Sequence, residues 1–239
     1  MNDYDVFARY YDKLMYDVDY DLICGFILSL SEKYGIKLPE LILDLGCGSG
    51  RMCLYFSKKG YDMIGIDISE DMLAVAKENA LKNSEDILYL NQDMTDFELY
   101  GSVKMAFCLT DGVNHVTDQR KVRRMFRRVY NYLDPGGIFI FDIIPEDRLM
   151  ETMGNNVFYD IDEDISYVWQ SKADKRGKVC EFELTFFIKQ ENGLYKREDT
   201  CIRERAYKSC ELKSWLLAAG FSKVKVFNKF GRMYFIGEK

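Results

Sequence analysis

The sequence predicts an α/β fold built around one open, mostly parallel sheet. Short apolar runs alternate with amphipathic helical patterns over residues 38–144, the element order of a sheet covered by helices on both faces. The first run ends in a turn with three glycines, and aspartates stand at the ends of two later runs. Because parallel strands present their carboxyl ends at one edge, these groups are expected to gather around a ligand.

Seven apolar runs are expected to form the strands of this sheet. They cover residues 41–45, 61–67, 88–91, 103–109, 138–144, 221–228 and 232–237. Helical patterns separate most of them, with Ser69 and Asp118 as N-cap residues of two helices. The last two runs are expected to form a hairpin, which makes the final strand antiparallel. An Asp-Pro-Gly-Gly turn at 134–137 precedes the fifth strand.

Residues 151–206 interrupt the alternation of strands and helices. Their β-rich runs cover 165–170, 179–190 and 195–206. The joints at 175–177 and 191–193 are typical of hairpin turns. We therefore expect a small antiparallel β lid of three to four strands, inserted after strand five.

The length of 239 residues suits one large domain with such an insertion. On this interpretation the main domain comprises 38–150 and 207–239. Residues 1–37 carry two apolar patterns at helical spacing and are expected to form an N-terminal helical cap.

Composition limits the classes of partner. The net charge of −6 disfavours nucleic acid, because phosphate-binding domains are usually basic. The seven cysteines include no C-x-x-C pair, so we expect free thiols in a reducing compartment and no metal. The polar N-terminus is unlike a signal peptide, and no apolar run has the length of a membrane span. A cytoplasmic protein with no membrane partner is expected; the oligomeric state is not indicated.

A strand, a glycine turn and a helical pattern follow one another at 41–56. The glycines are Gly46, Gly48 and Gly50, and Asp44 lies near the strand end. Such a turn lets backbone N–H groups and a helix N-terminus approach a ligand closely. The third glycine comes one residue too early for the nicotinamide fingerprint G-x-G-x-x-G. A glycine turn of another α/β protein is the alternative.

Two further strand ends carry aspartates that can accept hydrogen bonds from a nucleoside. Asp67 ends the second run, where a carboxylate can accept hydrogen bonds from both hydroxyls of a ribose. Asp93 follows the third run, where a carboxylate can accept one from an adenine amine, with the backbone of Met94 beside it. Met72 can cover an adenine face or simply pack in the core. Together with the glycine turn these residues predict a nucleoside pocket, although each alone could be a cap or turn residue.

The glycine turn resembles the first motif of the class I S-adenosylmethionine (SAM) dependent methyltransferases. That motif reads acidic-x-Gly-x-Gly-x-Gly, as does the segment 44–50. Other passages similar to this family are 7–15, 133–139 and 207–221. The resemblance covers nearly the whole chain. It implies a Rossmann-like, seven-stranded methyltransferase sheet, SAM as cofactor and S-adenosylhomocysteine as product.

The resemblance also implies which residues bind the cofactor. Residues 7–15 match the Phe-Ala-x-x-Tyr-Asp-x-x-Met opening of small bacterial members. In such members the tyrosine before the aspartate meets the methionine carboxylate of SAM, a role that falls on Tyr11. Asp44 is expected to brace the turn and hold the methionine end through water or backbone amides. The full expected set is Tyr11, Asp44, Gly46, Cys47, Gly48, Gly50, Asp67, Ile68, Met72, Asp93, Met94 and Leu109.

The acceptor side is expected near the only histidine of the chain, His115, in the loop after strand four. In the family the corresponding loop lines the methyl-transfer pocket. His115, Asp111 or a tyrosine of the lid are therefore candidates for a general base, and Asn114 for a substrate contact. A purely structural role is the alternative for a lone histidine. Asp142, near the end of strand five, is a further candidate for the substrate side.

In the family an insertion like 151–206 covers the active site and shapes the substrate pocket. The candidate pocket residues of this insertion are Tyr167, Trp169, Arg203, Arg205 and Tyr207. The sequence does not indicate which face of the lid each of them occupies.

The expected function is transfer of a methyl group from SAM to an amine or hydroxyl of a small molecule. The sulfonium is already activated, so positioning the acceptor and excluding water supply most of the rate. No Asn-Pro-Pro-Tyr or Asp-Pro-Pro-Tyr follows strand four, which disfavours DNA-base and glutamine N-methylation. The chain also lacks a Pro-Cys pair, which disfavours a cysteine-dependent RNA enzyme.

Three alternatives stay open at this point. A tRNA or protein methyltransferase is the first, although only the basic helix around Arg124 indicates an anionic partner. A non-catalytic, SAM-binding regulatory protein and a nicotinamide oxidoreductase are alternatives of other classes.

Overall fold

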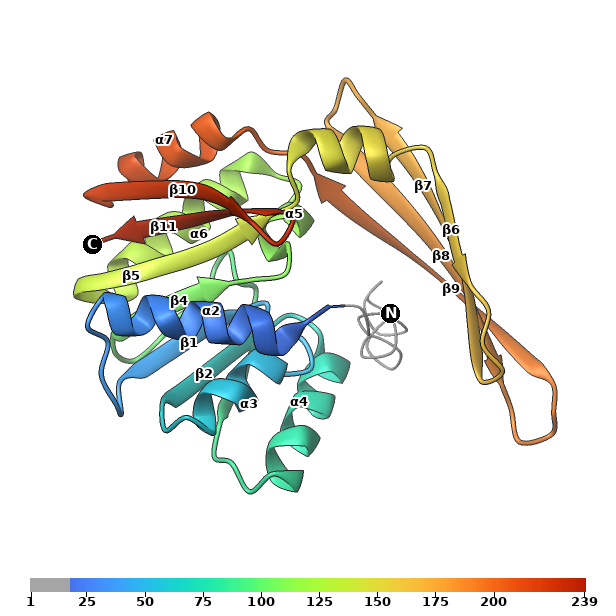
Figure 1. The fold of residues 1–239 in the computed structure, drawn as a ribbon, viewed down its shortest axis with the longest axis horizontal. Coiled ribbons are helices and arrows are strands. Elements are labelled where there is room, and N and C mark those ends of the chain that lie inside the picture. Colours follow the sequence, from blue (N-terminus) through green and yellow to red (C-terminus); the bar gives the residue numbers. More distant parts are fainter. Residues whose placement is uncertain (1–17) are drawn as a thin grey trace.

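The computed structural model describes residues 18–239, so the predicted helix around 4–15 and Tyr11 lie outside the described residues. The described chain forms a seven-stranded sheet and a separate four-stranded antiparallel sheet (Figure 1). The fold class predicted from the sequence is therefore confirmed. Among the described residues, no helix combines the length and the apolar character that a membrane span requires.

The first part of the chain alternates between strands and helices. Its elements are α2 (Tyr20–Lys33), β1 (Leu41–Leu45), α3 (Arg51–Ser57), β2 (Asp62–Asp67), α4 (Glu70–Lys82), β3 (Leu88–Asn91), β4 (Val103–Cys108), α5 (Gly112–His115), α6 (Gln119–Tyr132) and β5 (Leu133–Ile143). The expected caps are present, because the side chains of Ser69 and Asp118 accept hydrogen bonds from backbone N–H groups of α4 and α6.

The remaining chain leaves the main sheet and returns to it. Its elements are the π-helical turn η1 (Arg148–Met153), the strands β6 (Val157–Asp160), β7 (Ile165–Asp174), β8 (Val179–Lys189) and β9 (Tyr195–Arg205), and then α7 (Ser209–Ala219), β10 (Lys223–Lys229) and β11 (Arg232–Glu238).

The strand order in the large sheet is β10-β11-β5-β4-β1-β2-β3. Strand β1 pairs in parallel with β2 on one side and with β4 on the other. Strand β11 pairs antiparallel with β5, so the predicted antiparallel last strand is confirmed. From β1 the chain adds β2 and β3 on one side and then crosses back to add β4 on the other side of β1. The strand order therefore switches between β1 and β4, and open α/β sheets bind ligands at such a switch point.

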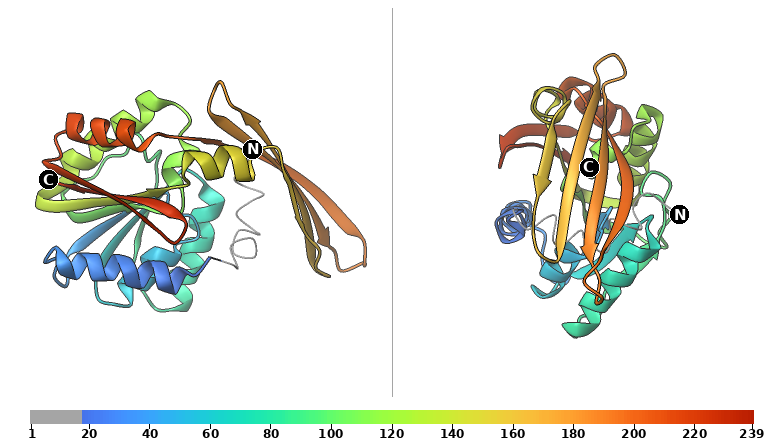
Figure 2. Two further views of the ribbon diagram at one scale, coloured as in Figure 1. Left: turned by 45° about the horizontal axis from the view of Figure 1, so that its top comes forward. Right: turned by 90° about the vertical axis from the view of Figure 1, so that its right-hand side faces the viewer.

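Helices cover both faces of the large sheet (Figures 1 and 2). One core lies under α2, α3 and α4 and includes the fully buried Phe56 and Phe107. The other lies under α5, α6 and α7 and includes Phe126 and Phe141. Because apolar side chains pack closely on both faces of the sheet, the carboxyl ends of its strands have fixed positions at which a site can form.

The fifth strand begins at Leu133 rather than at Ile138. Leu133 already pairs with Val103, and the register shifts before Met105 pairs with Ile138. The expected turn is therefore a bulge within the start of β5, with Gly136 at a φ of +71°. A bulge adds residues to one strand without ending its pairing with the neighbour, which explains why residues typical of a turn occur inside this strand.

The four-stranded sheet, here called the lid, has the order β6-β7-β8-β9 and is antiparallel throughout. It projects from the large sheet, with η1 at its base (Figure 2). Residues directly opposite in register share a face of a sheet. Glu204 pairs with Cys180, and Cys180 pairs with Ala173, so these three side chains lie on one lid face.

Candidate functional site

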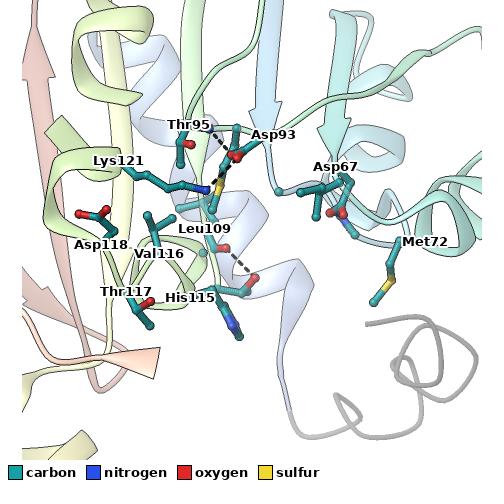
Figure 3. Close-up of a pocket in the computed structure, with 16 residues that line it drawn as sticks. Asp67, Met72, Asp93, Thr95, Leu109, His115, Val116, Thr117, Asp118 and Lys121 are labelled. Atoms are coloured by element: carbon teal, nitrogen blue, oxygen red, sulfur yellow. Dashed lines mark hydrogen bonds and ion pairs between the residues drawn. The ribbon is translucent and has the colours of Figure 1, made fainter. Parts of the chain in front are cut away.

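A cavity of about 350 Å³ lies at the carboxyl ends of β1 to β4, beside α5 and α6 (Figure 3). Its size falls within the ~300–1,000 Å³ that ligand pockets usually have. The residues that line it are Gly46, Gly48, Asp67, Ile68, Met72, Asp93, Met94, Thr95, Leu109, Thr110, Gly112, His115, Val116, Thr117, Asp118 and Lys121. The cavity therefore occupies the switch point of the sheet.

The glycine turn is tied to the end of β2. The N–H groups of Gly46 and Cys47 donate to the carbonyl of Ile66 at 2.8 and 3.0 Å, and Gly48 N–H donates to Asp67 Oδ2 at 2.9 Å. Gly46 and Gly48 have φ angles of +73° and +53°, a region that L side chains rarely adopt. The turn thus brings bare backbone to the cavity wall.

Gly50 is expected to tolerate no side chain. Its φ is +76°, and a Cβ there would lie 2.9 Å from the Cβ of Ala76 and would also clash with the hydroxyl of Tyr89. We expect Gly50→Ala to lower the free energy of unfolding by ~1–2 kcal/mol from the left-handed backbone alone, and by more because of the crowding. Urea unfolding measures this change. Gly101→Ala, where a Cβ meets nothing within 4 Å, is the control, and equal stability of the two variants would contradict the expectation.

Asp67 is held by two backbone donors. Its Oδ2 accepts from Gly48 N–H and its Oδ1 accepts from Ser69 N–H, both at 2.9 Å. Burial raises the pKa of this carboxyl, and backbone hydrogen bonds from Ser69, Gly48 and Ile68 oppose that shift. Each oxygen of a carboxylate can accept a second hydrogen bond, so Asp67 can still receive donors from the cavity.

Asp93 lines the cavity just after β3, the strand that neighbours β2. Thr95 N–H donates to its Oδ1 at 2.8 Å, and Lys121 Nζ lies 3.3 Å from its Oδ2. Although partial burial opposes the shift, the hydrogen bonds from Thr95 and the charge of Lys121 hold the pKa of Asp93 below its usual range. Lys121 comes from α6, and no motif in the sequence indicated it.

A small recess of about 20 Å³ continues the cavity behind the glycine turn. It shares Gly46, Leu109 and Thr110 with the larger cavity, and Asp44 and Cys47 also line it. The Asp44 carboxyl is buried, and Cys53 Sγ donates to its Oδ2 at 3.3 Å. Burial raises the pKa of Asp44 to about 7.

An ionisable cluster stands at the His115 end of the site, and its members come from distant parts of the chain. His115 Nε2 lies 3.9 Å from Asp111 Oδ2 and 3.8 Å from Glu204 Oε1. Arg232 contacts Asp111 and also lies 2.9 Å from Asp142 Oδ2. The cluster thus links α5, the last lid strand β9, and strands β5 and β11.

Burial governs the protonation of this cluster. It lowers the pKa of His115 below the usual range, against the opposing charges of Asp111 and Asp67. Burial also raises the pKa of Asp142 to about 6 and that of Glu204 well above the usual range. The imidazole is therefore neutral near pH 7 and able to accept a proton.

Known proteins resemble this chain over its full length. Residues 42–137 match a family model described as a methyltransferase domain. A putative methyltransferase of Geobacillus sp. (strain WCH70) is 31% identical over 245 residues, which cover 99% of each chain. An S-adenosylmethionine-dependent methyltransferase from Clostridium acetobutylicum ATCC 824 superposes with a TM-score of 0.86 at 26% identity, over 99% of both chains. This chain belongs to the class I SAM-dependent methyltransferases.

A sugar N-methyltransferase from Streptoalloteichus sp. ATCC 53650 also superposes on this methyltransferase. The TM-score is 0.80 at 19% identity, over 99% of this chain and 92% of that one. At this identity the likeness shows the shared fold alone.

The cavity of the methyltransferase fits the nucleoside part of SAM. The Asp67 carboxylate faces it from the end of β2, where a ribose would donate its hydroxyls, and Asp93 lines it after the neighbouring strand β3 (Figure 3). Met72 and Leu109 supply apolar wall, and Met72 is only 4% exposed, so it both packs and lines the cavity. Ile68 and Met94 also line it, whereas Cys47 borders the recess and Gly50 lines neither.

The structure does not bring Asn114 to the cavity. Its amide is fully buried, accepts from Ile144 N–H at 3.0 Å, and donates to the carbonyl of Arg205 at 3.0 Å. The neighbouring Tyr207 hydroxyl donates to the carbonyl of Val116. These bonds fasten the end of the lid to α5 and so hold Glu204 beside His115.

The other lid candidates do not line the cavity either. Trp169 packs against Phe182, with ring centroids 5.2 Å apart, and Tyr167 packs against Phe186. The register places both rings on the lid face of Glu204 and places Arg203 and Arg205 on the opposite face. The substrate role of these residues therefore stays a prediction.

Sequence reasoning missed Glu204, Arg232 and Lys121. Each is an ordinary charged residue of an amphipathic element, far along the chain from its partners. The one available signal was the alternation of buried and exposed residues in β9. Glu204 lies two residues after the apolar Ile202 and therefore on the same face of the strand. A carboxylate on the inward face of a strand indicates a buried charge, and a buried charge requires a partner.

Proposed function

We propose that this methyltransferase moves a methyl group from SAM to an amine or hydroxyl of a small molecule. The observation that carries the proposal is the position of His115. It lines the cavity (Figure 3), and its Nε2 also lies 3.8 Å from Glu204 Oε1 of the lid. The acceptor would enter between the cavity and the lid, which encloses a small molecule more readily than a macromolecule. The related fold of a sugar N-methyltransferase is consistent with an acceptor of this kind.

In this proposal the residues of the chain bind and orient SAM and the acceptor, and they remove a proton from the acceptor. When bound, SAM supplies an activated methyl group, so the protein must mainly position the acceptor and exclude water. Asp67 and Asp93 orient the nucleoside, and the glycine turn allows the methionine end to approach the recess at Asp44. His115 accepts a proton if the acceptor arrives protonated, and Asp111 stabilises the imidazolium that results.

A nucleic-acid acceptor is less well supported, because acidic neighbours offset the basic face of α6. Arg120 lies 2.9 Å from Asp118, Arg124 lies 3.2 Å from Asp96, and Lys121 is paired with Asp93. These pairs reduce the positive charge that this face can offer to phosphates.

A screen of small amines and phenols with SAM, followed by S-adenosylhomocysteine release, tests the proposal. We expect at least one acceptor to raise the release rate well above the rate without acceptor, and His115→Gln to remove most of that increase. SAM binding with no acceleration by any small acceptor, together with methylation of bulk tRNA or protein in the same assay, would contradict it.

A further inference from the structure

The cluster at the lid contains more acidic than basic groups. Its carboxyl groups are Asp111, Asp142 and Glu204, and its cation, Arg232, contacts the two aspartates, whereas Glu204 lies near His115. Glu204 is only 5% exposed, and its Oε2 has no hydrogen-bond partner among the described residues. A buried carboxyl without a partner is unfavourable, so the cluster is incomplete without a further donor or positive charge.

Three acceptor atoms of this cluster converge on one point. A carboxylate oxygen of Asp111, a ring nitrogen of His115 and a carboxylate oxygen of Glu204 all lie within 4.8 Å of one another. The two distances from His115 Nε2, 3.9 and 3.8 Å, are too long for hydrogen bonds. An ammonium nitrogen ~2.8 Å from three acceptors accommodates spacings between them from ~3.8 Å, with slightly bent N–H bonds, to ~4.6 Å, with linear ones. The spacing therefore admits one ammonium group between them.

We propose that the methyl acceptor is a small-molecule amine that enters as an ammonium ion, and that Glu204 and Asp111 bind its charge while His115 takes its proton. This inference rests on the proposed function and narrows its acceptor class from amine or hydroxyl to amine. A hydroxyl acceptor would bring no positive charge to the cluster, and it would leave the buried Glu204 carboxyl without a cationic partner.

The chemical step is balanced with these groups alone. One N–H bond of the ammonium breaks, its proton bonds to the His115 imidazole, and the electron pair stays on nitrogen. A neutral amine inverts freely, so this pair can turn to the methyl carbon of SAM. The new N–C bond forms as the S–C bond breaks, and the electrons of that bond remain on sulfur in S-adenosylhomocysteine. His115 then returns its proton to solvent.

Because His115 is the only histidine, its imidazole resonances report on the cluster without assignment by mutation. The test uses protein without a histidine tag, saturated with S-adenosylhomocysteine and titrated with cyclohexylammonium chloride or with cyclohexanol as the neutral match. We expect a saturable shift with the amine alone. We also expect the amine to lower the His115 pKa, because its charge adds to that of Arg232 and opposes those of Asp111 and Asp67.

Two variants sharpen the test. Glu204→Gln keeps the side-chain shape, removes the charge and is expected to weaken the amine's effect at least tenfold. Glu183→Gln, at an exposed position of the neighbouring lid strand β8, is the matched control and should behave as the wild type. The comparison of amine and alcohol in the wild type needs no variant, so the proposal stays testable if Glu204→Gln does not fold.

Several outcomes would overturn the proposal. They are no saturable shift with the amine, an equal shift with cyclohexanol, and an unchanged amine response in folded Glu204→Gln. Stoichiometric binding of Zn²⁺ at His115 would instead make the cluster a metal site. If Glu204→Gln weakens binding of SAM but not of S-adenosylhomocysteine, the carboxyl serves the sulfonium and not the acceptor. Failure to bind S-adenosylhomocysteine at all would count against the proposed function itself, which separates the two failures.

Discussion

Replacement of His115 by glutamine is expected to lower kcat for methyl transfer by about 10²–10⁴-fold, the usual contribution of a positioned general base. Affinity for SAM should change little, because Asp67, Asp93 and the glycine turn are unaltered. Single-turnover S-adenosylhomocysteine release measures the first quantity, and calorimetry with SAM measures the second. A His115→Gln variant that binds SAM and retains most of its kcat would show that the acceptor needs no base from this side chain.

The pH dependence follows from the same side chain. Since burial lowers the pKa of His115 below 6.5, the imidazole loses its basic form only at acidic pH. Wild-type kcat should therefore fall as the pH drops below about 6.5, and His115→Gln should lack this limb. The free energy of unfolding is expected to fall with falling pH as well. The unfolded chain takes up this proton more readily than the folded one, so His115 lowers stability as the pH falls through its unfolded pKa.

Asp67→Ala is expected to raise the Kd for SAM by about ten- to a hundredfold, which is about 1.4–2.7 kcal/mol. The carboxylate would lose its hydrogen bonds to the ribose, and Gly48 N–H would lose the acceptor that holds the turn at 2.9 Å. Because SAM and S-adenosylhomocysteine share the ribose, both should weaken equally in calorimetric titrations.

The matched control is Asp62→Ala, at the exposed start of the same strand β2. It should leave the affinity for SAM unchanged. Thermal unfolding of both variants shows whether the fold is intact. Unchanged SAM affinity in a folded Asp67→Ala variant would refute the ribose role of this carboxylate.

The sequence predicted the features that depend on local patterns. The glycine turn, Asp67 and Asp93 occur where apolar runs end, and a parallel sheet brings such ends to one edge whatever else the chain does. The same logic located His115 after strand four. Strand number and the antiparallel end of the sheet followed from run length and from the closing hairpin. The lid was recognisable because the alternation of strands and helices stops there.

The features that the sequence did not indicate depend on how separate elements dock. Glu204 meets His115 only because Asn114 and Tyr207 fasten the lid to α5. Whether Arg203 or Glu204 faces the site is a matter of strand register, since neighbouring residues of a strand point to opposite faces. Asn114 itself stood in the expected loop, but its side chain turns towards backbone groups at the base of the lid instead of the cavity.

The central claim is that the cavity at the carboxyl ends of β1 to β4 binds SAM. Calorimetric titration of the wild-type chain with SAM, S-adenosylhomocysteine and NAD tests it most directly. We expect SAM and S-adenosylhomocysteine to bind with one site per chain and NAD to give no heat of binding. Tight binding of NAD with no response to S-adenosylhomocysteine would contradict the account.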